Sequence, residues 1–298
     1  MDTKAVSPMT AKANAPEVVG FFHEPTNTIT YLVIDPATRH AAVIDPVLDY
    51  DAAAAKTGTA SADALLKEIS GRNLTIEWII ETHIHADHLS AGHYLKTRLD
   101  APIAVGNKIS TVQETFQPIF NLPYPFAPDG RQFDKLFEDG ESFSIGQLTA
   151  TVMATPGHTP ACMSYLVGDA LFVGDTLFMP DYGTARCDFP GGNAETLYKS
   201  IQKLLSLPGE TRMFLCHDYP PDDRPPAWET TVAEQKEKNV HIAGKSKAGF
   251  TALRNKRDAG LKMPALILPS IQLNMRAGEL PPEEDNGTAY LKIPLNRF

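Results

Sequence analysis

The chain has 298 residues, of which 43% are hydrophobic and 21% charged, and its formal net charge is −9. This composition is that of a globular protein with a core of ordinary size, and the length suits one large domain or one domain with an appendage. The acidic charge argues against non-specific nucleic-acid binding, which depends on basic surfaces, and no apolar run approaches the roughly 18 residues of a membrane helix.

The first half of the chain predicts a hairpin, a helix and a further strand. The apolar segments 29–34 and 41–44 flank a turn-like Asp-Pro-Ala sequence and predict two paired strands. A helix is expected over residues 60–68. The apolar run 76–80 predicts a strand that ends directly at a group of histidines.

The second half repeats this alternation of strands and helices. Segments 147–154, 163–167 and 170–173 have the spacing of a meander. Residues 194–206 carry apolar side chains at helical spacing, and 213–216 predicts one more short strand. A core of two sheets with helices outside fits this order of elements.

The composition changes beyond residue 220. Proline pairs at 220–221 and 225–226 break the chain, and residues 228–240 then predict an exposed, charged helix. The tail 264–298 is Pro-rich and is expected to be irregular. This region could pack on the core, cover an active site or support a dimer, and the sequence does not choose among these roles.

We therefore expect three parts. Residues 1–17 are polar and Ala-rich without the apolar stretch of a secretory signal, and we expect a flexible lead-in there. Residues 18–220 are expected to form the catalytic domain. Residues 221–298 are expected to form a helical and irregular extension packed on the core.

Four side chains that can bind a metal follow the strand 76–80 within six residues. His83 and His85 point the same way if the chain stays extended, and Asp87 and His88 then lie on the turn into a helix expected near Leu89. Ionisable groups this dense would repel one another or stay unsatisfied in a core without a metal. The segment therefore predicts a metal site.

Three further donors each follow a predicted strand. His158 lies in Thr-Pro-Gly-His-Thr, where the Pro-Gly pair fixes a tight turn and leaves the histidine at its tip. Asp175 and His217 each come directly after an apolar strand. A lone histidine at a strand end is more often structural, but strand ends can meet at one edge of a sheet, so together these residues predict additional ligands.

The remaining histidines and the cysteines are expected to be structural. Four histidines have no other metal-binding residues at ligand spacing around them, and we expect them at surface, capping or packing positions. They are His23, His40, His93 and His241. Cys162 and Cys216 adjoin strands and fit small core positions, whereas Cys187 is placed to meet a substrate. An odd number of cysteines in a long chain fits a reducing cytoplasm.

Taken in order, the seven donors resemble the signature of the metallo-β-lactamase superfamily. The resemblance covers residues 18–220 and implies an αββα sandwich, an α/β (α+β) fold of two mixed sheets flanked by helices, with the metal at one edge. Within the superfamily the chain is most similar to the persulfide dioxygenases, also called sulfur dioxygenases. The narrower likeness rests on residues 82–88, 155–159 with Cys162, 174–175, Arg186-x-Asp188-Phe189 and 217–219.

The narrower resemblance implies one Fe(II) per chain. Its ligands would be His83, His158 and Asp175, a two-histidine, one-carboxylate set that leaves open positions for O2 and substrate. The other donors would orient the ligands and waters, and these are His85, Asp87, His88 and His217.

The same donors divide differently in the dinuclear zinc hydrolases of the superfamily. One zinc would be held by His83, His85 and His158, the other by Asp87, His88 and His217, with Asp175 as the bridge. Because all seven donors are present, their identity does not distinguish one iron from two zincs.

The implied reaction is the oxidation of glutathione persulfide by O2 and water to sulfite and glutathione. Arg186 would pair with a substrate carboxylate or else with Asp188, and Tyr219 would hydrogen-bond the substrate or else pack as an aromatic side chain. The alternatives are a zinc hydrolase of the glyoxalase II type acting on glutathione thioesters, and a non-catalytic module with a structural metal. A homodimer is expected from the resemblance alone.

The extension also carries a basic stretch. Its members are Lys245, Lys247, Arg254 and Arg257. The simplest interpretation is a solvated helix face, although such a stretch could help to hold an anionic peptide.

Overall fold

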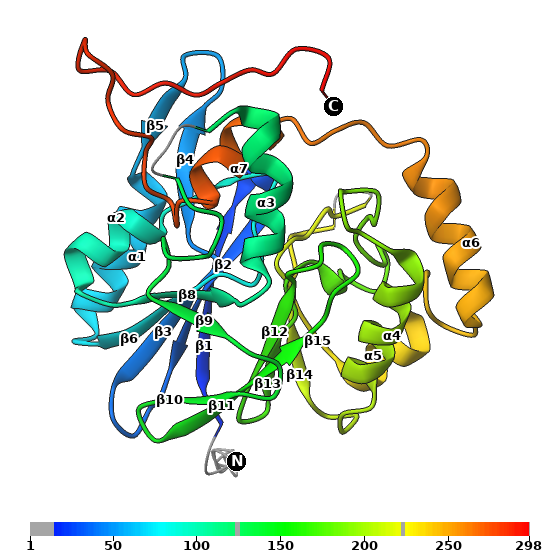
Figure 1. Cartoon of the computed structure of the whole chain (residues 1–298). Helices are drawn as coiled ribbons and strands as arrows, with labels where there is room; N and C mark the ends of the chain where they lie inside the picture. Colours follow the sequence, from blue (N-terminus) through cyan, green and yellow to red (C-terminus); the bar gives the residue numbers. More distant parts are fainter. Residues whose placement is uncertain (1–14, 123–125, 222–223, 298) are drawn as a thin grey trace.

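A computed structural model of the chain describes residues 15–122, 126–221 and 224–297. Most of the expected lead-in, residues 1–14, lies outside the described residues. Figure 1 shows two strand-rich halves that lie side by side, with helices on the outside of each.

The first sheet has six strands in the order β1-β2-β3-β6-β8-β9. They are β1 (Glu17–His23), β2 (Thr28–Ile34), β3 (His40–Ile44), β6 (Thr75–Ile80), β8 (Ile103–Gly106) and β9 (Lys135–Phe137). β1, β2 and β3 are antiparallel, and β3, β6, β8 and β9 are parallel. β2 is buried along its whole length, which explains its nearly continuous apolar sequence.

The second sheet also has six strands, in chain order from β10 to β15. They are β10 (Ser142–Ile145), β11 (Leu148–Ala154), β12 (Met163–Val167), β13 (Ala170–Phe172), β14 (Arg212–Phe214) and β15 (Glu229–Thr231). A small third sheet joins β4 (Val47–Asp51), β5 (Lys56–Gly58) and β7 (Leu89–Ser90).

The two large sheets face each other across an aromatic core. Tyr31 of the first sheet lies edge-on to Phe172 and Phe214 of the second, with ring centroids 5.3 and 5.6 Å apart. Successive residues of a strand point to opposite faces, so each sheet contributes every second residue to the layer between the sheets. These three side chains belong to that layer and are therefore buried.

Helices cover the outer face of each sheet. Three helices and the C-terminal helix pack on the first sheet, and these are α1 (Ala60–Gly71), α2 (Gly92–Leu99), α3 (Ile109–Phe120) and α7 (Ile267–Asn274). Three others pack on the second sheet, and these are α4 (Ala194–Leu205), α5 (Val232–Lys238) and α6 (Lys247–Asp258). The αββα sandwich expected from the sequence is therefore confirmed. No helix of the described residues is long and apolar enough to cross a membrane.

Three expected elements differ in the structure. The helix expected near Leu89 begins at Gly92, because residues 89–90 pair with β4 as β7. The exposed helix expected over 228–240 begins only at Val232, since residues 229–231 pair with β14 and extend the second sheet. The tail 264–298 is not wholly irregular, because it contains the buried helix α7.

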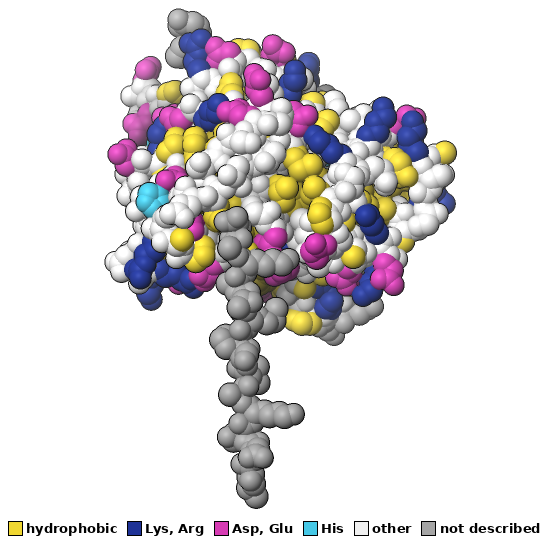
Figure 2. Space-filling view, turned by 90° about the horizontal axis from the view of Figure 1, so that it is seen from below, with side chains coloured by type: hydrophobic (Ala, Val, Ile, Leu, Met, Phe, Trp, Pro, Cys, Tyr) yellow, Lys and Arg dark blue, Asp and Glu magenta, His cyan; other side chains and the backbone are white. Residues whose placement is uncertain are grey.

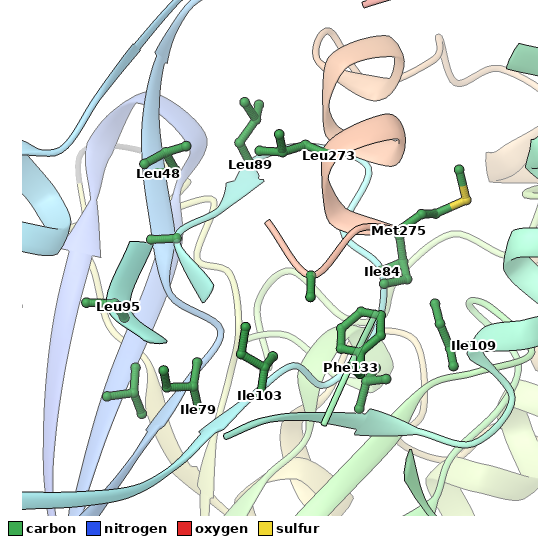
Figure 3. Close-up of a cluster of buried hydrophobic side chains, with 14 of the residues drawn as sticks. Leu48, Ile79, Ile84, Leu89, Leu95, Ile103, Ile109, Phe133, Leu273 and Met275 are labelled. Carbon is green, nitrogen blue, oxygen red and sulfur yellow. The ribbon is translucent and has the colours of Figure 1, made fainter. Parts of the chain in front are cut away.

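Helix α7 packs on the segment that carries the histidine cluster. Figure 3 shows Leu273 and Met275, at the end of this helix, near Leu89, which directly follows the cluster, and Ile84, which lies inside it between His83 and His85. Residues of α7, near the C-terminal end of the chain, therefore complete the core beside the predicted metal ligands.

The strands that precede the predicted ligands end at a common edge. β11, β13 and β14 run in the same direction, since β11 and β13 are each antiparallel to β12 and β13 is parallel to β14. The segments after these strands, together with the segment after β6, meet between the two sheets.

On the face of the molecule drawn in Figure 2, acidic and basic side chains are interspersed.

Candidate metal centre

The segment after β6 brings four predicted donors together. His83, His85 and His88 are buried, and the rings of His83 and His85 and those of His85 and His88 have centroids 4.1 Å apart. Such close packing of imidazoles is unfavourable if they are charged, and favourable if each lends a lone pair to a cation.

The three donors from the second sheet lie against this cluster. Asp175 is central, because its Oδ2 is 3.8 Å from His83 Nε2 and 3.6 Å from His158 Nε2, and its Oδ1 is 3.4 Å from His217 Nε2. His217 Nε2 also lies 3.2 Å from Asp87 Oδ2. All seven predicted donors therefore lie in one centre.

The seven donors fall into two groups, each with its donor atoms within 4.8 Å of one another, and Asp175 of the first group also lies within this distance of His217 of the second. The first group is His83, His158 and Asp175. The second is His85, Asp87, His88 and His217.

The donor atoms that face this centre lack hydrogen-bond partners among the described residues. They are His83 Nε2, His85 Nδ1, His88 Nε2, His217 Nε2 and Asp175 Oδ1. A buried polar atom without a partner is costly. A cation in the group of His83, His158 and Asp175 would satisfy the first and last of these atoms, and the three others would need water or a second ion. Imidazole and carboxylate ligands suit zinc or iron, so the residues present fit a transition-metal site.

The opposite side of each imidazole is hydrogen-bonded. His85 Nε2 donates to Asp45 Oδ1 at 3.0 Å, and His158 Nδ1 donates to the Arg186 carbonyl at 2.7 Å. Thr82 Oγ1 donates to Asp45 Oδ2 at 2.9 Å and lies 3.0 Å from His83 Nδ1. These contacts fix which nitrogen of each ring is free to bind a metal.

The sequence analysis did not identify Asp45, although it is buried and supports two ligands. Its position one residue after β3 was the available signal, because β3 and β6 are parallel neighbours and end at the same edge.

Burial and nearby charges shift the pKa values of the clustered histidines in opposite directions. Burial, with the nearby His85, lowers the pKa of His88 to about 4 and holds the pKa of His83 well below its usual value. Burial also opposes protonation of His85, but the carboxylates of Asp45 and Glu81 outweigh it and raise the pKa of that imidazole well above its usual value. His83 and His88 are therefore neutral and ready to bind a metal at neutral pH.

Asn274, at the end of α7, holds the backbone of the cluster. Its Nδ2 donates to the carbonyls of His85 and His88 at 2.9 and 2.8 Å, and its Oδ1 accepts from the Ser90 N–H at 2.8 Å. The asparagine is buried, and the sequence analysis missed it because it lies in a tail expected to be irregular.

The two predicted substrate-binding residues lie near the centre in different settings. Arg186 makes a bidentate pair with Asp188 (2.5 and 2.6 Å) and donates to the Lys262 carbonyl at 2.6 Å. Tyr219 packs against His217 and Tyr182, with ring centroids 5.7 and 4.9 Å apart, and no described residue hydrogen-bonds its hydroxyl.

A cavity of about 380 Å³ opens onto the centre. Asp87, His158 and Asp175 are among its lining residues, with the aromatic rings of Phe178 and Tyr219. The C-terminal region supplies another part of the wall, through Arg254, Arg257, Leu261 and residues 264–266. Such a volume is typical of a small-molecule site.

Arg254 is buried rather than solvated and connects α6 to the centre. Its guanidinium pairs with Asp258 at 2.6 Å and donates to the Thr184 carbonyl at 2.8 Å. Asp258 Oδ2 also accepts from the Cys187 N–H at 2.8 Å, next to the Arg186 carbonyl that orients His158. A buried charge needs a partner of this kind.

The cysteines show no sign of activation. All three are free and buried, and burial raises the pKa of Cys162 and of Cys187 to about 12. A thiol of such pKa is protonated at neutral pH and is a poor nucleophile.

His241 is also buried, contrary to the surface position expected for it. Its Nδ1 accepts from the Thr184 N–H at 3.0 Å. Burial, together with the positive charges of Arg254, Arg257 and Lys245, lowers the pKa of His241 to about 4.

The lowered pKa of His241 predicts that the protein loses stability in acid. The unfolded chain takes up a proton near pH 6.5 and the folded one only near pH 4, so the free energy of unfolding falls as the pH drops through that window. The contribution is about 3 kcal/mol at most. In His241→Asn, whose amide oxygen replaces the acceptor, we expect a flatter stability curve between pH 6.5 and 4 in denaturant titrations. A slope equal to that of the wild type would contradict the assignment.

The fold and the set of buried donors are those of a metal-binding enzyme. Comparison with known proteins agrees with this class. Residues 24–217 match the metallo-β-lactamase superfamily, and the chain belongs to that superfamily. The match includes all seven donors and ends before α5, α6 and α7.

Two relatives are about half identical to the chain. It is 54% identical over 268 residues to glyoxylase B2 of Dictyostelium discoideum, covering 89% of this chain and 92% of that protein. It is 52% identical over 290 residues to a probable metallo-hydrolase of Burkholderia pseudomallei, covering 94% and 99% of the two chains.

Persulfide dioxygenases are more distant relatives. The mitochondrial persulfide dioxygenase ETHE1 of Bos taurus is 32% identical over 276 residues, covering 91% of this chain and 92% of that protein. The crystal structure of ETHE1 from Myxococcus xanthus superposes with a TM-score of 0.71 at 32% identity, covering 88% of this chain and all of the other.

Proposed function

We propose that the protein is an iron-dependent persulfide dioxygenase that acts on glutathione persulfide. The observation that carries the proposal is the group of His83, His158 and Asp175, two of which line the cavity. Two histidines and one carboxylate on one face of a ferrous ion leave positions for O2 and substrate. The similarity to the ETHE1 proteins over nearly the whole chain supports the same activity.

The proposed reaction consumes one glutathione persulfide, one O2 and one water, and yields one glutathione and one sulfurous acid. Ferrous iron held by the three donors would supply the oxygen chemistry, which no side chain in the cavity offers. The protein holds the reacting end of the substrate beside His158 and Asp175. The aromatic wall of Phe178 and Tyr219 limits water around that end.

A zinc-dependent thioester hydrolase is the second candidate. The group of His85, Asp87, His88 and His217 favours it, because it would complete a site for a second ion. The names of the two relatives at 54% and 52% identity point the same way.

The expected homodimer, the cytoplasmic location and a domain boundary near residue 220 stay predictions.

Oxygen uptake by Fe(II)-loaded protein, prepared without air, tests the proposal. On addition of glutathione persulfide we expect uptake of O2 with sulfite formed in a ratio of about one to one, as the balanced reaction requires. The metal content of the same sample is measured, and a zinc-loaded sample is tested with a glutathione thioester. Uptake absent from a sample of verified iron content, together with thioester hydrolysis by the zinc form, would replace the dioxygenase by the hydrolase.

A further inference from the structure

The cavity wall beyond the metal donors carries positive charge and no described carboxylate. Its charged residues there are Arg186, Arg254 and Arg257, and its only acidic residues are Asp87 and Asp175 of the metal centre. The whole chain has a net charge of −9, and charges of both signs mix on the outer face drawn in Figure 2. The positive wall is therefore a local feature of this cavity.

Two of the three arginines are already occupied. Arg186 forms a bidentate pair with the exposed Asp188, and these hydrogen bonds hold the pKa of that carboxyl below its usual value although partial burial opposes the shift. Arg254 pairs with Asp258 inside the protein. A guanidinium engaged in this way has little capacity left for a ligand.

Arg257 is different, because no described carboxylate pairs with it. It follows Arg254 by three residues on α6, and residues at this spacing lie on one side of a helix. Arg254 and Arg257 therefore both reach the cavity, but Arg254 is buried and Arg257 is exposed. The low pKa of His241, to which both arginines contribute, agrees with a positive environment there.

We propose that Arg257 binds a carboxylate at the non-reacting end of the substrate and thereby selects a carrier thiol with an anionic tail. A guanidinium matches a carboxylate in shape and donates two parallel hydrogen bonds to it. Glutathione, with two carboxylates, has this chemistry. The inference rests on the proposed function only for the position of the reacting end, at the metal.

The test measures binding rather than turnover. S-methylglutathione, which has no free thiol, and its diethyl ester, in which both carboxylates are blocked, are titrated calorimetrically into metal-loaded protein. Arg257→Gln is compared with Lys256→Gln, the same loss of charge at the neighbouring exposed residue, which does not line the cavity. Both positions are on the surface of α6, so both variants are expected to fold.

We expect Arg257→Gln to weaken binding of S-methylglutathione by about 10-fold, the effect of one charge-assisted pair. Lys256→Gln should change it less than about 2-fold, as expected for a remote surface charge. The diethyl ester should bind the wild type and Arg257→Gln equally. Equal effects of the two substitutions, an ester that binds as tightly as the free acid, or no binding to the wild type at millimolar concentration would each overturn the proposal.

These outcomes are separate from those of the oxygen measurement. A selective effect of Arg257→Gln without O2 uptake would leave the anion site in place and remove the dioxygenase. O2 uptake with binding that is indifferent to Arg257 would do the reverse.

Discussion

Replacing His158 with alanine is expected to abolish activity and to lower the metal content of the purified protein. His158 Nε2 lies 3.6 Å from Asp175 Oδ2, and its other nitrogen donates to the Arg186 carbonyl, so the ring is fixed with Nε2 facing the centre. Loss of a residue that only supports a ligand lowers metal affinity or activity by about 10–100-fold, so loss of a ligand itself should lower them by more than about 100-fold. Metal analysis and the oxygen assay on the same preparation give the result.

The control for this variant is His93→Ala. His93 lies on α2 outside both donor groups, so this variant should keep its metal and its activity. Circular dichroism distinguishes loss of ligand from loss of fold. A folded His158→Ala protein with full metal content and full activity would show that His158 is not a ligand.

Replacing Asn274 with alanine is expected to destabilise the protein and to weaken its hold on the metal. The substitution leaves two buried carbonyls and one buried N–H without their partner, which costs about 3 kcal/mol or more. The carbonyls belong to His85 and His88, so the backbone of the second donor group loosens as well. Denaturant unfolding of the metal-free protein measures the first effect, and titration against a competing chelator measures the second.

Gln272→Ala is a closely matched control. Gln272 lies two residues earlier on α7, is also buried, and also makes three hydrogen bonds with the backbone, but these go to Leu268 and Lys292, away from the metal centre. It should lower stability without changing metal affinity. We expect Asn274→Ala to weaken metal binding by about 10–100-fold relative to it. Equal metal affinities for the two variants would show that Asn274 acts on stability alone.

Both α6 and α7 lie beyond the part of the chain that matches the superfamily, yet they contact the centre. α7 holds the cluster after β6 through Asn274. α6 holds the loop beside His158 through Arg254 and Asp258. The C-terminal region therefore belongs structurally to the site, and substitutions there should alter metal and substrate binding.

The sequence by itself determined the fold class, and it singled out the seven predicted donors that the structure brings together in one centre. It could do so because strands have a residue period of two and end at turns that the sequence marks, and because the donors follow those strands directly. The hairpin of residues 29–34 and 41–44 and the helix over 60–68 were predicted on the same basis and are confirmed.

Only the tertiary structure revealed the residues that support the donors. Asp45, Asn274 and Arg254 reach the centre from distant parts of the chain, and no local pattern distinguishes a buried arginine on an amphipathic helix from a solvated one. The same reason explains the position of Leu89, which pairs with β4 instead of starting a helix. Long-range pairing and burial decide these positions, because they depend on which segments meet in space, and a local sequence pattern does not contain that information.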